Sequence, residues 1–243
     1  MLDRSSPEDR LVLPPVFTPV PADEGKSAFR HALGQAETLG AGAFVHALRP
    51  DRLDVAVVFE PEEPWSGARR ILLLGLDALA DALVAAAPPA MAVTLRWPDT
   101  VLIHGATAGG VRLAPSAPVT GRDVPAAVVL GLTVRLAAGP GREPGEWVRG
   151  TALAEEGLDD LDPAAFCDLL AAHILSRTDL WLAEGFERIG AGLIGRLDPS
   201  PASGARIGPD GDLVGPDGRI LSAFPPAPHR PAWLDPVTEA PWL

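Results

Sequence analysis

Three stretches of the chain place apolar residues three or four positions apart, the spacing that forms one face of an amphipathic helix. The first stretch, residues 23–39, stops before Gly40, and glycine commonly follows the last turn of a helix. The second, residues 64–87, begins at Pro64, a residue favoured in a first helical turn. The third covers residues 163–197. This pattern predicts helices near the start, before the middle and towards the end of the chain.

Four residues in or beside these stretches have a predictable place. Asp77 and Asp81 are four positions apart, so we expect both on the solvent-facing side of the second helix. Asp162 is expected to be the N-cap of the third stretch, and a break near Gly185 divides that stretch into two helices. Cys167 lies among apolar residues, and we interpret it as a small buried hydrophobic residue rather than a nucleophile.

Shorter apolar runs between the helical stretches indicate strands at residues 43–48, 53–59, 92–97, 100–104, 110–113 and 126–136. The last run is almost continuously apolar, which is typical of a central strand. Within residues 207–221, two Pro-Asp-Gly turns separate short apolar strands and predict a small β-meander. The order of elements indicates an α+β domain with a mixed, mostly antiparallel sheet covered on one side by helices.

Proline distribution divides the chain into three expected parts. Residues 1–22 are proline-rich and form an extended N-terminal arm, and residues 23–198 form the main α+β domain. Residues 199–243 form a small β-rich C-terminal segment that ends in a proline-rich tail carrying Trp233 and Trp242. We therefore expect one large domain with an appendage at each end.

Composition narrows the classes of partner. The chain has 243 residues, 47% of them hydrophobic, and a net charge of −12. An acidic surface repels phosphate backbones and anionic lipids, so we expect neither nucleic acid nor membrane as the main partner. The first residues show no secretory signal, and we expect a cytoplasmic location. The single cysteine excludes an internal disulfide, and five histidines without ligand spacing indicate no metal site.

Four motifs occur in a fixed order: Leu-Arg-Trp-Pro-Asp-Thr-Val at residues 95–101, Ala-Gly-Gly-Val at 108–111, Val-Leu-Gly-Leu-Thr-Val at 129–134, and Gly-Thr-Ala-Leu-Ala-Glu-Glu-Gly at 150–157. They resemble the Lys-Trp-Pro-Asn-Asp, Lys-x-Gly-Gly-Ile, Gly-Ile-Gly-Ile-Asn-Val and Thr-Ser-Leu signatures of the biotin/lipoate protein ligases. The resemblance covers roughly residues 12–200 and is closest to a divergent bacterial, ligase-like branch of uncertain function.

The resemblance implies a fold, a chemistry and a set of site residues. The expected fold is the catalytic domain of this family, followed by a small β-rich segment. In the family, ATP activates a small carboxylic acid (biotin, lipoate or octanoate), and the acyl-adenylate passes to a lysine of a carrier protein. No further cofactor is implied. The matched positions make the following residues candidates for ligand binding: Arg96, Trp97, Asp99, Thr107, Gly109, Gly110, Arg112, Arg49, Gly131 and Thr151.

The chain departs from the family at the positions that carry positive charge. Arg96 stands where the first motif has lysine, and Thr107 (or Ala108 under a one-residue shift) stands where the second has it. The arginine-rich loop is shortened to residues 48–52. An arginine holds a carboxylate or phosphate bidentately, but threonine carries no charge. The loss of one fixed charge beside a developing anion costs on the order of a hundredfold in rate, so ordinary ligation is in doubt. Arg112 is a candidate replacement.

Several candidates also have structural explanations. A hairpin or bulge accounts for Gly109 and Gly110 as readily as a close ligand does. Arg49 and Arg52 are more typical of a solvated hairpin tip than of a loop that closes over phosphates. Thr151 serves equally well as the cap of the turn that follows it.

Three functions therefore stay open. In the first, the protein binds a small carboxylic acid or its adenylate without turnover, as a pseudoenzyme. In the second, it is an active ATP-dependent ligase or acyltransferase that modifies an acyl-carrier or biotinyl/lipoyl-type protein. In the third, it is a non-catalytic assembly protein that docks through its proline-rich ends and exposed tryptophans. The uncharged Thr107 favours the first function over the second.

Overall fold

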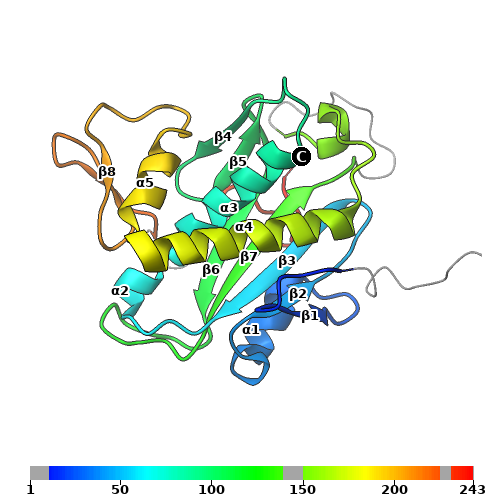
Figure 1. Ribbon diagram of the computed structural model, residues 1–243, viewed down its shortest axis with the longest axis horizontal. Coiled ribbons are helices and arrows are strands. Elements are labelled where there is room, and N and C mark those ends of the chain that lie inside the picture. Colours follow the sequence, from blue (N-terminus) through cyan, green and yellow to red (C-terminus); the bar gives the residue numbers. More distant parts are fainter. Residues whose placement is uncertain (1–10, 139–149, 225–230, 243) are drawn as a thin grey trace, which may run out of the picture.

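The computed structural model describes residues 11–138, 150–224 and 231–242 (Figure 1). Residues 1–10 of the arm expected at residues 1–22, and residues 225–230 of the expected tail, lie outside this part, whereas Thr18–Pro21 of the expected arm forms a strand of the sheet. A seven-stranded sheet organises the fold, with antiparallel neighbours except for the parallel first pair. Its strand order is β1 (Thr18–Pro21), β2 (Ala43–His46), β3 (Arg52–Phe59), β7 (Val128–Arg135), β6 (Ala106–Pro115), β5 (Thr100–Ile103) and β4 (Val93–Arg96). The predicted mixed, mostly antiparallel α+β architecture is confirmed.

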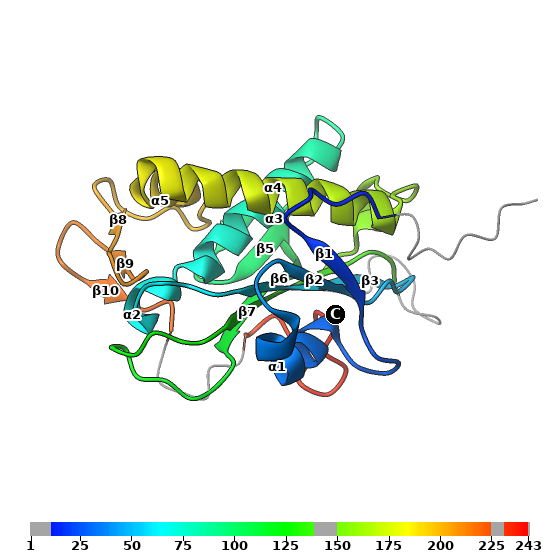
Figure 2. The ribbon, with the colours of Figure 1, turned by 60° about the horizontal axis from the view of Figure 1, so that its bottom comes forward.

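Helices cover both faces of this sheet, not one as expected (Figure 2). One face carries the large hydrophobic core and the helices α3 (Ile71–Ala86), α4 (Pro163–Glu184) and α5 (Glu187–Ile194). The opposite face carries α1 (Ala28–Leu39) over a smaller apolar cluster. C-terminal residues cover a further part of this face (Figure 2), and no pattern in the sequence places them there. Two single-turn helices, α2 (Trp65–Ala68) and η2 (Leu153–Glu156), connect larger elements.

The helices confirm the expected positions but shift some ends. The first helix begins at Ala28 rather than at Asp23, because the Ser27 hydroxyl accepts a hydrogen bond from the Arg30 amide and caps it there. The stretch 64–87 is divided into α2 and α3. The break near Gly185 and the N-cap at Asp162 are both confirmed.

The expected solvent-facing pair on α3 is wrong, because α4 packs along that side of the helix. Asp77 is 3% exposed, and its carboxylate pairs with Arg177 Nε at 2.6 Å and Arg196 Nη1 at 3.1 Å. Asp81 pairs with Arg196 Nη2 at 2.5 Å and also with Arg177. Two carboxylates and two arginines thus join α3, α4 and the turn after α5. We call these four residues the helix-layer cluster.

The C-terminal region forms the predicted meander. Strands β8 (Arg206–Ile207), β9 (Leu213–Val214) and β10 (Ile220–Leu221) form a separate three-stranded antiparallel sheet. Residues 231–242 then return to the α1 face of the large sheet (Figure 2). Within the described ranges, no helix combines the length and apolar character needed to cross a membrane.

Candidate functional site

A row of five residues crosses the α1 face of the large sheet. The strand registers pair Arg96 with Thr100, Thr100 with Gly110, Gly110 with Thr133, and Thr133 with Asp54. Residues that face each other in register point to the same side of a sheet. Neighbouring strands are about 4.8 Å apart, so the backbones of Arg96 and Gly110, which lie two strands apart, are separated by roughly 10 Å. The motifs at residues 95–101 and 108–111 therefore contribute residues to the same face of the sheet.

Arginines lie on either side of this row. Arg112 faces Gly131 across β6 and β7, and Arg52 faces Arg135 across β3 and β7. All three arginine side chains are buried, between 5% and 9% exposed. Arg52 was expected at a solvated hairpin tip, and that expectation is wrong because C-terminal residues cover it. In a protein with a net charge of −12, this face concentrates positive charge.

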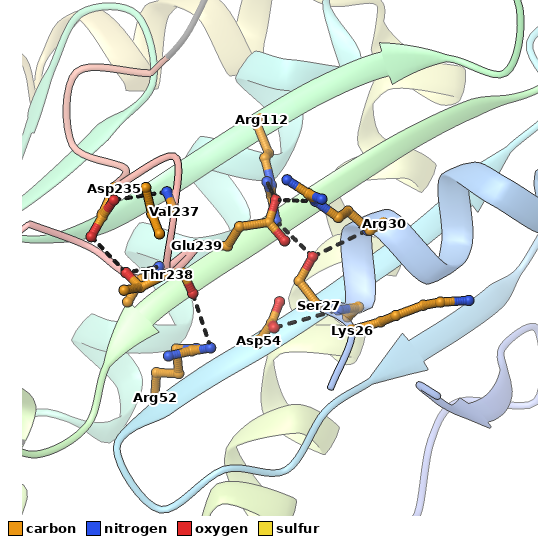
Figure 3. Close-up of polar contacts among 12 residues, drawn as sticks. Lys26, Ser27, Arg30, Arg52, Asp54, Arg112, Asp235, Val237, Thr238 and Glu239 are labelled. Carbon is orange, nitrogen blue, oxygen red and sulfur yellow. Dashed lines mark hydrogen bonds and ion pairs between the residues drawn. The ribbon is translucent and has the colours of Figure 1, made fainter. Parts of the chain in front are cut away.

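Glu239, from the C-terminal residues, neutralises part of this charge (Figure 3). Its Oε1 accepts a hydrogen bond from Arg112 Nη1 at 2.9 Å and pairs with Arg30 Nε at 2.9 Å. Burial alone would raise the pKa of Glu239, but hydrogen bonds from Ser27 and Arg112 and the charge of Arg112 hold it below its ordinary value. The Arg112 guanidinium also stacks on the Phe29 ring, 4.2 Å from its centroid. Arg112 is thus already a carboxylate-binding residue.

Other C-terminal residues complete the cover. Arg52 Nη2 donates to the Thr238 carbonyl at 3.3 Å, and Arg135 Nη2 donates to the Pro241 carbonyl at 2.6 Å. Trp233 is 2% exposed. The expectation of an exposed tryptophan at this position is therefore wrong, because its indole packs against the sheet.

Asp54 is the buried carboxylate of the row. Its Oδ2 accepts a weak hydrogen bond from the Ala28 amide at 3.4 Å, which ties β3 to the start of α1. Burial raises the pKa of Asp54 to about 6, against the opposing charges of Arg112 and Arg52. Within the described part of the chain, Asp54 Oδ1 and Thr133 Oγ1 have no hydrogen-bond partner. These are two of several polar atoms among the described residues of this face that are buried without a partner.

The three candidate glycines have different reasons to be glycine. A methyl group on Gly109 would collide with the backbone of Thr133 and Val134 on β7, so this position reflects strand packing. A methyl on Gly110 would collide with the Asp99 carbonyl oxygen at 2.2 Å and with Trp233 Nε1 at 2.5 Å, and one on Gly131 would lie 2.6 Å from the Phe29 ring. Gly110 and Gly131 therefore provide bare backbone beneath flat side chains.

Comparison with known proteins identifies the family. Residues 13–193 match the model of the biotin/lipoate A/B protein ligase family. The chain belongs to this family. It is 31% identical over 182 residues to a biotin–[acetyl-CoA-carboxylase] ligase from Paracoccus denitrificans, an alignment that covers 67% of this chain and 74% of that relative.

Solved structures of the ligase family agree with this fold. A biotin protein ligase-like protein of unknown function from Silicibacter sp. TM1040 superimposes with a TM-score of 0.75 at 27% identity, covering 88% of this chain and 97% of that one. The biotin protein ligase of Aquifex aeolicus in complex with biotin and ATP gives a TM-score of 0.62 at 13% identity, covering 84% and 95%. The second likeness is one of fold alone.

The remaining family-motif residues have local contacts. Arg96 is exposed at the end of β4, and Trp97 packs in part against the helix-side core. Asp99 is buried, with its carboxylate accepting from the Thr100 hydroxyl at 2.9 Å and its carbonyl accepting from the Val111 amide at 2.8 Å. These contacts hold the turn between β4 and β5 against β6.

Thr107, Thr151 and Arg49 take part in contacts of the backbone. The Thr107 carbonyl accepts from the Thr151 amide at 2.9 Å, and the Thr151 hydroxyl donates to Glu156 Oε1 at 2.6 Å within the turn that it precedes. Arg49 Nη2 donates to the Lys26 carbonyl at 2.9 Å, ahead of α1. The structure thus brings Gly110, Arg112 and Gly131 together under one cover, with Gly110 in register with Arg96 through Thr100. Thr107, Thr151 and Arg49 instead make local structural contacts.

Sequence reasoning missed several residues of this face: Ser27, Arg30, Asp54, Arg135 and Glu239. Charged residues at the ends of otherwise apolar strands were the available signal for Asp54 and Arg135. No local pattern marks Glu239, because its partner Arg112 is 127 positions away in sequence.

Proposed function

We propose that this family member binds a small carboxylic acid, or the adenylate of one, on the α1 face of its sheet. Arg112 is the carboxylate-binding residue, and Gly110 and Gly131 provide the floor. One observation carries this proposal: Arg112, in a family strand and 9% exposed, already holds a carboxylate. A relative of the same fold is solved in complex with biotin and ATP, which supports the class of ligand.

The physical basis is charge in a place shielded from water. Hydrogen bonds between an ion pair are roughly twice as strong as neutral ones, and an arginine offers two parallel donors to one carboxylate. Arg112 is held in place by the Phe29 ring and by the Ser27 hydroxyl, 3.4 Å from its Nη2. A side chain that is fixed before a ligand arrives loses little conformational entropy on binding. The face is therefore suited to a small acid with an apolar body.

Ordinary ligation is not part of the proposal. Activation of a carboxylate by ATP needs positive charge beside the α-phosphate as well as beside the carboxylate. Thr107 occupies the position at which the family motif has lysine, and its side chain carries no charge. We therefore propose binding without efficient adenylation.

An active ligase is the second candidate, and one observation favours it. Arg52 and Arg135 face each other across β3 and β7, on the same face as Arg112. This pair supplies two further cations near the row that contains Gly110. In this alternative they would neutralise a phosphate of bound ATP. In this alternative the acceptor is a lysine of a biotinyl- or lipoyl-type carrier protein.

Two assays test the proposed function. The first measures binding of biotin, lipoate and octanoate by calorimetry. Arg112→Ala should lower the affinity for the bound acid at least tenfold, and Arg112→Lys should lower it less. Arg188→Ala, which removes an exposed arginine of α5, is the matched control and should bind unchanged. The second measures pyrophosphate release from ATP with each acid, together with mass detection of the acyl-adenylate.

The two assays separate the candidates. Binding without pyrophosphate release supports the proposal, and robust release by the unaltered protein would establish the ligase instead. Thr107→Lys, alone or with Arg96→Lys, should raise any trace release by up to about a hundredfold, because it restores a fixed charge. An acid that binds with equal affinity to the Arg112→Ala variant would contradict the assigned site.

A further inference from the structure

The C-terminal residues 233–241 lie across the face that we propose to bind the acid (Figure 3). They cover the floor with the Trp233 indole, which occupies the space above Gly110. They also bring the Glu239 carboxylate to Arg112 and Arg30. A ligand with a carboxylate and an apolar body needs these same two places.

The segment is folded in a way that presents Glu239. The Asp235 carbonyl accepts from the Glu239 amide at 2.9 Å, and its carboxylate accepts from the Val237 amide and the Thr238 hydroxyl, both at 2.8 Å. The Asp235 amide donates to the Ala240 carbonyl at 2.9 Å, which closes the loop. Glu239 itself has a φ of 53°, in the left-handed region that favours glycine. Such a backbone conformation persists only where surrounding contacts hold it, and here these include the hydrogen bond of the Glu239 amide to Asp235 and the contacts of the Glu239 carboxylate with Arg112 and Arg30.

The fit between segment and sheet is incomplete. Arg52 and Arg135 donate to backbone carbonyls of the segment, those of Thr238 and Pro241. In the described structure, Arg52 Nε, Arg112 Nε and Trp233 Nε1 are buried without a hydrogen-bond partner. An open cavity of about 290 Å³ also remains beside the segment, with a lining that includes Phe29, Arg30, Arg112, Leu234 and Glu239. Buried polar groups without partners cost free energy, so this contact is one that a better-matched ligand can displace.

We propose that residues 233–241 are an intramolecular plug of the acid-binding site. The Glu239 carboxylate stands in for the carboxylate of the ligand, and the Trp233 indole stands in for its apolar body. A small acid therefore binds only after the plug leaves, and the affinity measured for the unaltered protein is the affinity of the open form multiplied by the fraction of molecules in which the plug is open. This inference rests on the proposed function, because it concerns regulation of the same site.

The plug and the acid must then be coupled reciprocally. Weakening the plug tightens binding of the acid, and binding of the acid loosens the plug, by the same factor. The variant Trp233→Ala/Glu239→Gln removes the indole and the carboxylate that occupy the site, and it keeps the chain at full length. Glu239→Gln alone keeps the shape of the side chain and guards against a double variant that fails to fold. Trp242→Ala is the matched control, since that tryptophan follows the plug and is 49% exposed.

Two measurements on the full-length proteins test this coupling. Calorimetry gives the dissociation constants for biotin, lipoate and octanoate, and hydrogen–deuterium exchange reports the amides of residues 231–242. We expect the double variant to bind an acid at least tenfold more tightly, Glu239→Gln to lie between, and Trp242→Ala to match the unaltered protein. We also expect a saturating acid to speed exchange of this segment in the unaltered protein.

The outcomes distinguish failure of the plug from failure of the proposed function. Equal affinity for an acid in the double variant and the unaltered protein overturns the plug and leaves acid binding standing. Faster exchange in the double variant, with none of the three acids bound by any protein, overturns acid binding and with it this regulation. Exchange of residues 231–242 at the rate of an unstructured peptide in the unaltered protein overturns the plug directly.

Discussion

The molecule contains two clusters of arginines and carboxylates, and they are built differently. In the helix-layer cluster, Asp77 and Asp81 match Arg177 and Arg196 one for one, and all four belong to α3, α4 and the turn after α5. On the α1 face, Arg52 pairs with its neighbour Asp51, whereas Arg30 and Arg112 share the carboxylate of Glu239 from the C-terminal residues. The first cluster is balanced in charge within the helix layer, whereas Arg30 and Arg112 of the second depend on one carboxylate of the plug.

This difference indicates which cluster serves structure and which serves binding. In the helix-layer cluster each arginine already contacts both carboxylates, so no charged group is left for a ligand to bind. An excess of arginine with unsatisfied polar atoms, such as Asp54 Oδ1 and Thr133 Oγ1, is costly to the fold and has a use only if something else binds there. Substitutions in the two clusters should therefore differ in their effects on stability.

Removal of one carboxylate from the helix-layer cluster should have the largest effect on stability. Asp77→Ala leaves Arg177 and Arg196 without their most buried partner, and we expect a loss of about 3 kcal/mol in the free energy of unfolding. Urea denaturation monitored by circular dichroism measures it. The acid-binding affinity should not change. A loss below about 0.5 kcal/mol, the size typical of surface pairs, would show that this cluster is not structural.

Asp54 should behave in the opposite way, because it is placed at a cost to the fold. Its pKa is raised from 3.8 to about 6, so the protonated form is favoured in the folded state. That contribution is fully present below pH 3.8 and is lost as the pH rises through about 6. Asp54→Asn cannot ionise, and at pH 7 it should be more stable than the unaltered protein by about 2–3 kcal/mol.

Denaturation curves between pH 4 and pH 8 check this effect. The difference in unfolding free energy between Asp54→Asn and the unaltered protein should grow across the interval around the raised pKa and then level off. A difference that does not vary with pH would mean that ionisation of Asp54 does not destabilise the folded protein.

The pair between Glu239 and Arg112 should contribute less to stability. We expect Glu239→Gln to lose about 1 kcal/mol, since the amide keeps one hydrogen bond but not the charge. The pKa of Glu239 is lowered in the folded protein, so its contribution is present above the ordinary pKa and disappears as the pH falls through the lowered one. Thermal melting at neutral and acidic pH, with and without added salt, measures this. A loss equal to that of Asp77→Ala would make the plug part of the rigid fold.

The smallest effect is expected at the exposed pair of Glu184 and Arg188 on α4 and α5. The carboxylate and the guanidinium are 2.9 Å apart, but the side chains are 49% and 69% exposed. Glu184→Gln should change the unfolding free energy by less than about 0.5 kcal/mol. This variant calibrates the other three, because it removes the same kind of charge from a solvated place. A larger change would mean that exposed ion pairs contribute more to the stability of this protein than surface pairs usually do.

Local patterns predicted much of the fold. The spacing of apolar residues predicted α1, α3 and α4, Asp162 and Gly185 predicted where α4 begins and ends, and the paired Pro-Asp-Gly turns predicted the meander. Hydrogen bonds that form helices, caps and tight turns join residues at most a few positions apart, so their signals lie within short windows. The order of four motifs predicted the family, which the match to residues 13–193 then confirmed.

The sequence by itself therefore determined most of the elements, the family and the strand that carries Gly110 and Arg112, but not strand β1 or the division of residues 64–87 into two helices. Only the tertiary structure decided which charges meet. Asp77 lies inside because α4 covers α3, and Arg52 is buried because the C-terminal residues cover β3. Trp233 and Glu239 reach the sheet from more than 100 positions away. A charge is stabilised in the interior only by the partners that folding brings to it, and the spacing of residues along a chain does not record partners at that distance.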